Sequence, residues 1–340
     1  MSSMVSDDHK QLRMMTCPGC KAKVFIPGDL PPLSTSPCRK CGHGIMMPMR
    51  MRQFELRSVI ASGGMGTVYR AFDVVLEREV AFKVMKPEMA SEPHALDSFY
   101  REARACASLN HTNIIHIYTF DEFEGQKYLV MELADKGSLD SRIEQHQRLP
   151  ELDVLDVGIK VASALNLALK HNFLHRDIKP GNILFNADNE PKLVDFGLAR
   201  RTEAESDPEE GTWGTPYYVA PEKIKREPET FLSDLYSLGG TLYHALTGHV
   251  PFEAPTVEEV VYAHVHTPLT PPIAVVPEVS EACSEALVTA MAKNPAERFQ
   301  SYDEFIMAFT AAQSQLLRRL YAPQEDSPAA KIGKGGWWRR

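Results

Sequence analysis

The sequence predicts an α+β chain with two lobes, preceded by a small module that contains paired cysteines. Two close cysteine pairs come first along the chain. Segments rich in Val, Ile and Phe follow them, and segments with helical periodicity come last. With 340 residues, the chain has room for one large domain and one small domain. An apolar fraction of 44% is ordinary for a protein that buries a core.

The first predicted element is a module at residues 16–49, which holds two C-x-x-C pairs separated by 17 residues. This spacing is typical of a four-thiolate zinc site, and the module has too few apolar residues to fold without such a staple. Two disulfides are the alternative, which a reducing compartment disfavours. Residues 1–15 are polar and are expected to be disordered. The predicted ligands of a structural Zn²⁺ are Cys17, Cys20, Cys38 and Cys41.

An antiparallel sheet is predicted to begin near Phe54. The runs F-E-L-R-S-V-I and V-V-L-E-R-E-V-A-F-K-V-M have strand composition, and the glycine-rich segment Ala61–Tyr69 lies between them. Ser91–Leu109 has apolar residues at helical spacing, and Tyr128–Leu133 is a further apolar strand. This part should therefore be a sheet with one helix.

The rest of the chain is predicted to be mainly helical. Apolar residues recur at helical spacing in each of four further segments. These are Leu152–Leu169, Leu232–Leu246, Glu281–Met291 and Ser301–Leu317.

Charge and hydropathy exclude several classes of function. A net charge of −8 and a pI near 5.9 disfavour nucleic acid as a partner. No stretch approaches the roughly 18 apolar residues of a membrane span, and the polar N-terminus lacks a signal core, so a cytoplasmic location is expected. The tail at residues 319–340 combines basic residues with Trp337 and Trp338. It could contact a membrane interface or a partner groove, or it could simply be a disordered end.

The run F-L-H-R-D-I-K-P-G-N-I-L at Phe173–Leu184 precedes L-V-D-F-G at Leu193–Gly197. Transfer of a phosphoryl group requires metal ions that neutralise its charge and a group that orients the acceptor hydroxyl. Carboxylate, amide and lysine side chains in one short span can supply both. We therefore predict phosphoryl transfer by Asp177, Lys179, Asn182 and Asp195.

The glycine-rich segment supports the same chemistry, because glycines let backbone N–H groups approach phosphates. Glycines of this kind also occur in tight hairpins. Here a strand lysine, Lys83, follows at a suitable distance, and Glu102 on the next helix is its natural ion-pair partner.

Together these motifs resemble the eukaryotic-type (Hanks-type) serine/threonine protein kinases, most closely the bacterial branch, which often carries G-G-M-G-x-V-Y. The resemblance extends from Arg52 to Leu317 in the order and spacing of the family. It implies a bilobal protein-kinase fold at residues 52–318, with the N-lobe at 52–133 and the C-lobe at 134–318. Further matching motifs are A-P-E at Ala220–Glu222, D-L-Y-S-L-G at Asp234–Gly239, T-G-x-x-P-F at Thr247–Phe252, and Arg298.

The resemblance implies a role for each catalytic residue. Asp177 would accept the proton of a Ser or Thr hydroxyl in a protein substrate, and Lys179 would steady the γ-phosphate. Asn182 and Asp195 would bind Mg²⁺ or Mn²⁺. Thr215 would bridge Asp177 and Lys179.

It also implies an ATP site between the lobes, with Met131 as gatekeeper and with backbone groups of Glu132 and Ala134 at the adenine edge. The first glycine of the family's loop is replaced by Ala61, so we expect altered nucleotide affinity rather than lost activity. The predicted ATP-binding residues are Ala61, Ser62, Gly63, Gly64, Met65, Gly66, Val68, Ala81, Lys83, Met131, Glu132, Ala134 and Leu184.

Arg176 precedes the predicted catalytic Asp177, so its guanidinium could bind a phosphate on the following loop. We expect the kinase to autophosphorylate this loop, and we favour Thr212 as the regulatory phosphosite, because Thr215 is needed beside Asp177. A carboxylate from the acidic residues of that loop is the alternative counter-charge.

Structural roles are implied for three further residues. Glu222 and Arg298 are expected to form a buried ion pair, and Asp234 is expected to anchor the backbone of the catalytic loop.

The sequence thus favours an ATP-dependent serine/threonine kinase in which a zinc ribbon with an unidentified ligand localises or regulates the enzyme. One alternative is a zinc-ribbon adaptor whose kinase domain is mainly a scaffold. The intact catalytic residues oppose it. Another is a kinase of small molecules, which the A-P-E and G-T-P elements of the peptide-docking surface disfavour.

Overall fold

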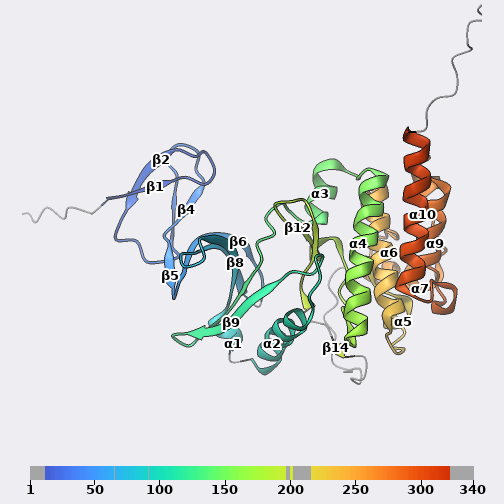
Figure 1. The fold of residues 1–340 in the computed structure, drawn as a ribbon, viewed down its shortest axis with the longest axis horizontal. Helices are drawn as coiled ribbons and strands as arrows, with labels where there is room; N and C mark the ends of the chain where they lie inside the picture. Colours follow the sequence, from blue (N-terminus) through green and yellow to red (C-terminus); the bar gives the residue numbers. More distant parts are fainter. Residues whose placement is uncertain (1–11, 65, 91, 197–199, 202–215, 322–340) are drawn as a thin grey trace, which may run out of the picture.

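The computed structural model describes residues 12–64, 66–90, 92–196, 200–201 and 216–321. Figure 1 shows three parts in a row: two small hairpins, a curled sheet flanked by a helix, and a lobe of helices. This arrangement confirms the predicted α+β, bilobal fold with a small N-terminal module. In the part of the chain that the structure describes, no helix has the length and apolar composition needed to cross a membrane.

The N-terminal module consists of two hairpins. β1 (Leu12–Thr16) pairs with β2 (Lys23–Pro27), and β3 (Thr35–Pro37) pairs with β4 (Gly44–Met46). Because β1 begins at Leu12, the disorder predicted for residues 1–15 is wrong for residues 12–15, whose pairing with β2 was not evident from their composition. Residues 1–11 lie outside the described residues.

The module and the first lobe share one sheet. β5 (Met49–Met51), the last strand of the N-terminal segment, is hydrogen-bonded to β6 (Phe54–Ser62), so the predicted boundary between residues 49 and 52 falls inside a sheet. All pairs in this sheet are antiparallel. In spatial order its strands are β5 (Met49–Met51), β6 (Phe54–Ser62), β7 (Gly66–Asp73), β8 (Arg78–Met85), β10 (Gln126–Met131) and β9 (Ile117–Phe123).

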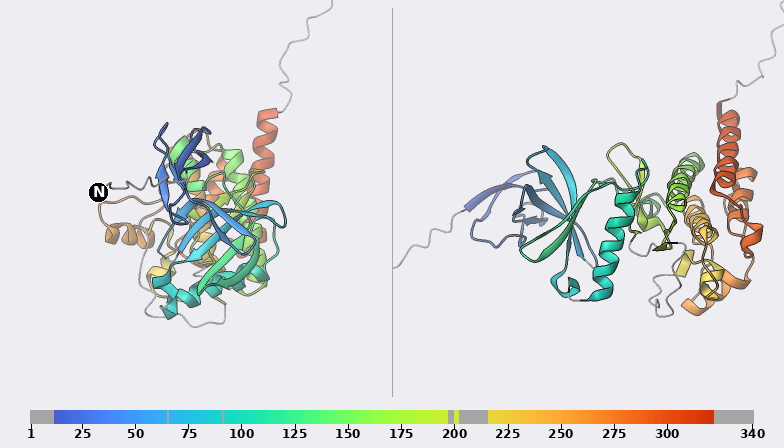
Figure 2. Two further views of the ribbon diagram at one scale, coloured as in Figure 1. Left: turned by 90° about the vertical axis from the view of Figure 1, so that its left-hand side faces the viewer. Right: turned by 60° about the horizontal axis from the view of Figure 1, so that its bottom comes forward.

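Alternation along β8 divides its side chains between the two faces of the sheet. Ala81 contributes to the main core, together with Phe99 of α2 (Pro93–Ser108), which follows the short α1 (Pro87–Ala90). The right-hand view of Figure 2 shows α2 running alongside the sheet. Phe82 belongs to a separate cluster and stacks on Tyr128, with 4.6 Å between ring centroids.

The N-terminal module and β5 together cover this second cluster. Met46 and Met51 are 3% and 1% exposed, and both belong to the cluster around Phe82 and Tyr128. The module is therefore packed against the sheet rather than merely tethered to it.

The second lobe is built around α4 (Glu151–Lys170) and α6 (Phe231–Thr247), both of which are extensively buried. The Thr230 side chain caps the start of α6, and Gly248, with φ of 77°, ends it. The predicted long helices are present to within a few residues, and the last one continues to Tyr321, past its predicted end at Leu317 and past the predicted domain limit at residue 318. The other elements are α3 (Leu139–His146), β11 (Phe173–Leu174), β12 (Ile183–Phe185), β13 (Pro191–Leu193), β14 (Arg200–Arg201), α5 (Pro221–Ile224), α7 (Val257–His266), α8 (Pro272–Val275), α9 (Glu281–Ala290) and α10 (Tyr302–Tyr321).

The predicted ion pair between Glu222 and Arg298 is present and buried. Two guanidinium nitrogens of Arg298 lie 2.7 and 2.8 Å from the two carboxylate oxygens of Glu222, and Ser233 also donates to Glu222. Burial acts to raise the pKa of Glu222, but the hydrogen bonds and charge of Arg298 outweigh it, so the pKa is lowered. The ion pair connects α5, which carries Glu222, to the segment between α9 and α10, which carries Arg298.

We expect Met51→Ala to lower the free energy of unfolding by about 2–5 kcal/mol, because it removes a buried side chain between the module and the sheet. Urea unfolding would measure the change. Met307→Ala is the matched control, since Met307 is 63% exposed. Equal unfolding midpoints for the two variants would contradict the shared core.

Glu222→Gln should destabilise the second lobe by about 3–5 kcal/mol, because it leaves Arg298 buried without its counter-charge. The lowered pKa of Glu222 means that its contribution is present at neutral pH and is lost as the pH falls through that pKa. The difference in stability between wild type and variant, measured by urea unfolding, should therefore shrink on acidification. A difference that stays constant down to acid pH would contradict this account.

Candidate active site

The loop that carries Asp177 is anchored on α6. Asp234, in the first turn of that helix, is 3% exposed, and its two carboxylate oxygens accept hydrogen bonds from the backbone N–H groups of His175 and Arg176, both at 2.7 Å. Burial raises the pKa of the Asp234 carboxyl, and the donated hydrogen bonds act in the opposite direction. The predicted anchoring role of Asp234 is confirmed.

The segment that carries Asp195 is tied to the same loop. The imidazole Nε2 of His175 lies 3.0 Å from the carbonyl oxygen of Val194, and its ring meets the Phe196 ring edge-on at 4.6 Å. Arg176 and Asp195 have φ of 68° and 65°, in the left-handed region that non-glycine residues rarely adopt. Strained backbone of this kind is concentrated at functional sites.

Two predicted site residues converge on the Asp177 carboxylate. The ammonium Nζ of Lys179 lies 2.7 Å from Asp177 Oδ2, and the amide Nδ2 of Asn182 lies 2.9 Å from the same oxygen. Asn182 Nδ2 also donates to the backbone carbonyl of Asp177 at 2.8 Å. Because the Asn182 nitrogen is engaged in this way, its Oδ1 is the atom that could bind a divalent cation together with Asp195.

The glycine-rich segment is the tight hairpin between β6 and β7. The Gly63 N–H donates to the Gly66 carbonyl at 2.9 Å, and Ala61 is paired with Val68. A Cβ on Gly66 would lie 2.4 Å from the carbonyl oxygen of Val84, so the hairpin needs glycine there. Met65 lies outside the described residues.

Lys83 lies on β8 with its ammonium 5.7 Å from the centre of the Phe99 ring of α2. Glu102 is on the same helix, but its side chain lies outside the described part of the chain, so the ion pair with Lys83 stays a prediction. Of the predicted nucleotide-binding residues, Val68 on β7, Ala81 on β8 and the gatekeeper Met131 on β10 lie on consecutive strands of one sheet, and Leu184 lies on β12, which pairs with β13.

The segment after Met131 connects the lobes through charged contacts that the sequence did not reveal. The Glu132 N–H donates to the carbonyl oxygen of His116 at 2.8 Å, and its carboxylate forms an ion pair at 2.7 Å with Lys192. Asp135, three residues later, accepts from Arg70 of β7 at 2.6 Å. Since the Glu132 N–H is used internally, adenine would have to use the Glu132 carbonyl and the backbone of Ala134.

Arg176 is paired with Glu229, a residue that the sequence reasoning missed. Its guanidinium contacts one Glu229 oxygen, while Lys223 Nζ lies 3.7 Å from the other. Glu229 belongs to no motif in the sequence. The only signal that could have identified it is its position just before the predicted helix that became α6. Thr212 and Thr215 lie outside the described residues.

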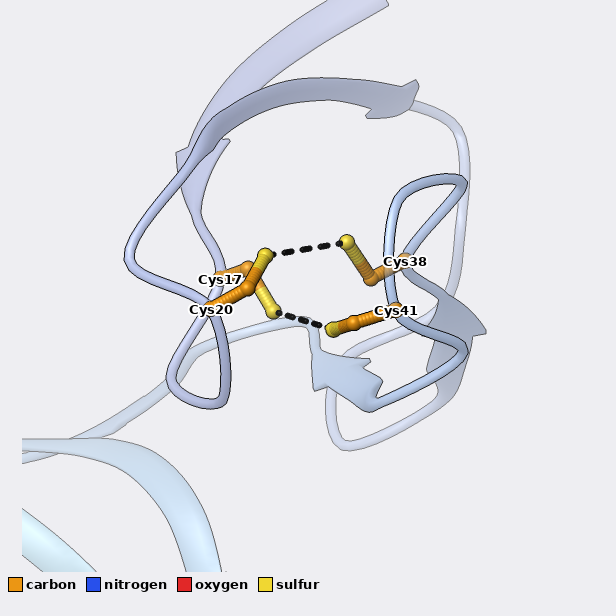
Figure 3. Close-up of side chains that lie close together, drawn as sticks. All are labelled: Cys17, Cys20, Cys38 and Cys41. Carbon is orange, nitrogen blue, oxygen red and sulfur yellow. Dashed lines mark hydrogen bonds between the residues drawn. The ribbon is translucent and has the colours of Figure 1, made fainter.

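The four cysteines of the N-terminal module lie on two facing loops, with their sulfurs turned toward each other (Figure 3). The Sγ distances are 3.6 Å for Cys17–Cys41 and 3.8 Å for Cys20–Cys38, and all four sulfurs lie within 4.8 Å of one another. A disulfide would need about 2.05 Å, whereas a tetrahedral zinc site with Zn–S bonds of about 2.3 Å places sulfurs about 3.8 Å apart. The cluster therefore fits zinc and not two disulfides.

One thiol of this cluster has a local reason to ionise. The backbone N–H of Lys40 points at Cys38 Sγ at 3.4 Å, and hydrogen bonds of this kind lower the pKa of Cys38 to about 6. Metal binding requires thiolates, so the turn favours the form that a cation would bind.

Comparisons with known proteins agree with this geometry. The family model described as protein kinase domain matches residues 54–310. The serine/threonine-protein kinase PknA of Mycobacterium tuberculosis is 35% identical over 285 residues, which cover 82% of this chain and 65% of PknA. The probable serine/threonine-protein kinase PknB of Lactococcus lactis is 32% identical over 269 residues, which cover 78% of this chain and 43% of that protein.

The chain thus spans between about two fifths and two thirds of the length of these relatives. The family model nevertheless covers most of the chain, in the same region as the two lobes and the loops described above. The chain belongs to the protein kinase family, in its bacterial Hanks-type serine/threonine branch.

Proposed function

We propose that this chain is an ATP- and Mg²⁺-dependent kinase that phosphorylates Ser and Thr hydroxyls of proteins. The observation that carries the proposal is the convergence of Lys179 and Asn182 on Asp177, in a loop anchored by the buried Asp234. A carboxylate, an amide and a lysine held together in this way are the groups that phosphoryl transfer requires.

Asp177 would accept the proton of the attacking hydroxyl. Lys179 and Asn182 both contact Oδ2, so Oδ1 is the oxygen we expect to face the substrate. The positive charge of Lys179 would also stabilise the negative charge that develops on the transferred group.

The nucleotide would bind between the lobes. The backbone of the Gly63–Gly66 hairpin would donate to the phosphates, and Lys83 would reach the α- and β-phosphates. Mg²⁺, when bound, neutralises phosphate charge, and Asn182 and Asp195 are the residues we expect to hold it.

A protein substrate is supported by the segment that follows residue 215. Its Pro216–Tyr218 turn is held on the second lobe, where the Tyr218 hydroxyl lies 2.8 Å from Nδ1 of His244 of α6. Lys223 of the following helix α5 lies 3.1 Å from the Arg176 carbonyl, so this segment is beside the Asp177 loop, where we expect a peptide rather than a small molecule to bind. Autophosphorylation at Thr212 remains a prediction of the sequence.

We propose that the zinc ribbon regulates the first lobe, because Met46 and Met51 complete the core behind Phe82 and Tyr128. Zinc would then stabilise both the ribbon and the sheet that holds Lys83. In this proposal residues 16–49 form the ribbon and residues 52–318 form the kinase domain, and the two share one core. The basic tail after residue 319 remains a candidate for contacts with a membrane or a partner.

The alternative function, an adaptor whose kinase domain is mainly a scaffold, has less support. A scaffold has no need for Asp177 to be held by Lys179 and Asn182, nor for strained backbone at Arg176 and Asp195.

Asp177→Asn should lower kcat by about 10²–10⁴-fold, because it removes the proton acceptor, while ATP affinity stays within about threefold. Phosphate transfer to a basic protein substrate and ATP binding by calorimetry would measure the two effects. Asp188→Asn is the matched control, since Asp188 is exposed on a turn. Full activity of Asp177→Asn would reject Asp177 as the acceptor.

Purified protein should contain about one zinc ion per chain, measured by mass spectrometry of the metal. Chelation should speed amide hydrogen exchange in residues 12–51 and also in β6 and β8, because the two parts share a core. Cys38→Ser should lose zinc, whereas Cys283→Ser, outside the cluster, should keep it. Unchanged exchange in residues 12–51 would reject the zinc ribbon, and a change confined to residues 12–47 would reject the coupling.

A further inference from the structure

Arg70 lies on β7, on the face of the sheet that the predicted nucleotide site uses. In the register of the sheet it is opposite Ala81, and Val68, two residues earlier on the same strand, is opposite Lys83. Directly paired residues on neighbouring strands share a face, and so do residues two apart on one strand. The Arg70 side chain therefore lies on the same face as these predicted nucleotide-binding residues.

The guanidinium of Arg70 contacts two carboxylates that belong to different parts of the chain. Its Nη2 lies 2.6 Å from Oδ2 of Asp135 and 2.9 Å from Oε2 of Glu79, which is on the neighbouring strand β8. The contact with Glu79 stays within the first lobe, whereas Asp135 belongs to the segment that connects the lobes. Arg70 thus joins β7 to the connecting segment.

The connecting segment is held on the second lobe both before and after Asp135. Before it, the Glu132 carboxylate pairs at 2.7 Å with Lys192 of β13, whose side chain is 8% exposed. After it, the Lys136 N–H donates to the carbonyl oxygen of Phe185 of β12 at 2.9 Å. Because the segment is held in this way, the ion pair between Asp135 and β7 sets how β7 lies relative to the second lobe.

The stability that this ion pair adds does not by itself explain Arg70. The side chains of Arg70 and Asp135 are 35% and 22% exposed, and ion pairs that are accessible to water contribute little to folding. The Nε of Arg70 is buried and has no hydrogen-bond partner among the residues that the structure describes. A buried donor without a partner is unfavourable. Arg70 is therefore better explained by the two segments that it connects.

We propose that Arg70 is a positioning residue for ATP. Through Asp135 it fixes β7 and β8 relative to Ala134, whose backbone we expect at the adenine edge. Without this ion pair, the connecting segment would have to become ordered when the nucleotide binds, which lowers the affinity. This inference rests on the proposed kinase function and adds to it a residue that acts on nucleotide affinity and not on the transfer step.

The test uses the full chain. Arg70→Gln should raise the KM for ATP roughly three- to tenfold and leave kcat within about twofold, because the loop that carries Asp177 keeps its own contacts. Calorimetry with a non-hydrolysable ATP analogue should show the same loss of affinity. Arg70→Lys, which keeps a positive charge, should lose less affinity than Arg70→Gln.

Arg57→Gln is the matched control. Arg57 lies on β6 of the same sheet, and its Nε is 3.2 Å from a carboxylate oxygen of Glu55 on the same strand. The substitution therefore removes an arginine–carboxylate pair that does not reach the connecting segment. It should leave both KM and kcat unchanged.

A double-mutant cycle separates the two contacts of Arg70. Asp135→Asn should weaken binding of the analogue as much as Arg70→Gln does, and the double variant should weaken it no further. Glu79→Gln removes only the contact within the first lobe, so it should leave the affinity unchanged.

Several results would overturn the proposal. Arg70→Gln could bind the analogue as tightly as Arg57→Gln, its kcat could fall as far as its kcat/KM, Glu79→Gln could match it, or the effects of Arg70→Gln and Asp135→Asn could add in full. Absence of phosphate transfer by a wild type that binds the analogue would instead reject the proposed kinase function. Because the calorimetry does not depend on transfer, the two failures are distinguishable.

Discussion

The contact on which the active site depends is the one between the buried Asp234 carboxylate and two successive backbone N–H groups. A buried carboxylate must have its oxygens satisfied, and here both are satisfied by the loop that precedes Asp177. The N-terminal turn of α6 favours negative charge, and Glu222 and Glu229 lie near it as well. Arg176 and Arg298 balance these carboxylates. The N-terminal end of α6 therefore holds in place both the loop that carries Asp177 and the segment that follows Glu222.

The first lobe depends on a different constraint, the two-sidedness of its sheet. Alternation along β8 directs Ala81 to the core shared with α2 and Phe82 to the opposite side. In the described chain, that opposite side is closed by Met46 of the cysteine module and by Met51 of β5. The N-terminal segment is thus connected to the sheet of the first lobe both by these side chains and by the pairing of β5 with β6.

Much of this could be predicted from the sequence, because the motifs that carry it are local. The helices and the four-cysteine cluster follow from short patterns at fixed spacing, and the Glu222–Arg298 pair and the anchoring by Asp234 were implied by the resemblance to the kinase family. Contacts between distant segments with no motif of their own could not be predicted, such as Glu132 with Lys192 or Arg176 with Glu229. The strand at Leu12 was missed for a related reason, since its stability comes from pairing with β2 and not from its own composition.

The pairing of β5 with β6 has a consequence for how this protein can be divided. A fragment beginning at residue 52 would contain every catalytic motif, yet it would leave β6 as an open edge and uncover the apolar face around Phe82 and Tyr128. Unpaired edges and uncovered apolar patches both promote self-association. The smallest catalytic fragment that we expect to stay monomeric is therefore larger than the region that the family motifs define, and it includes the cysteine module.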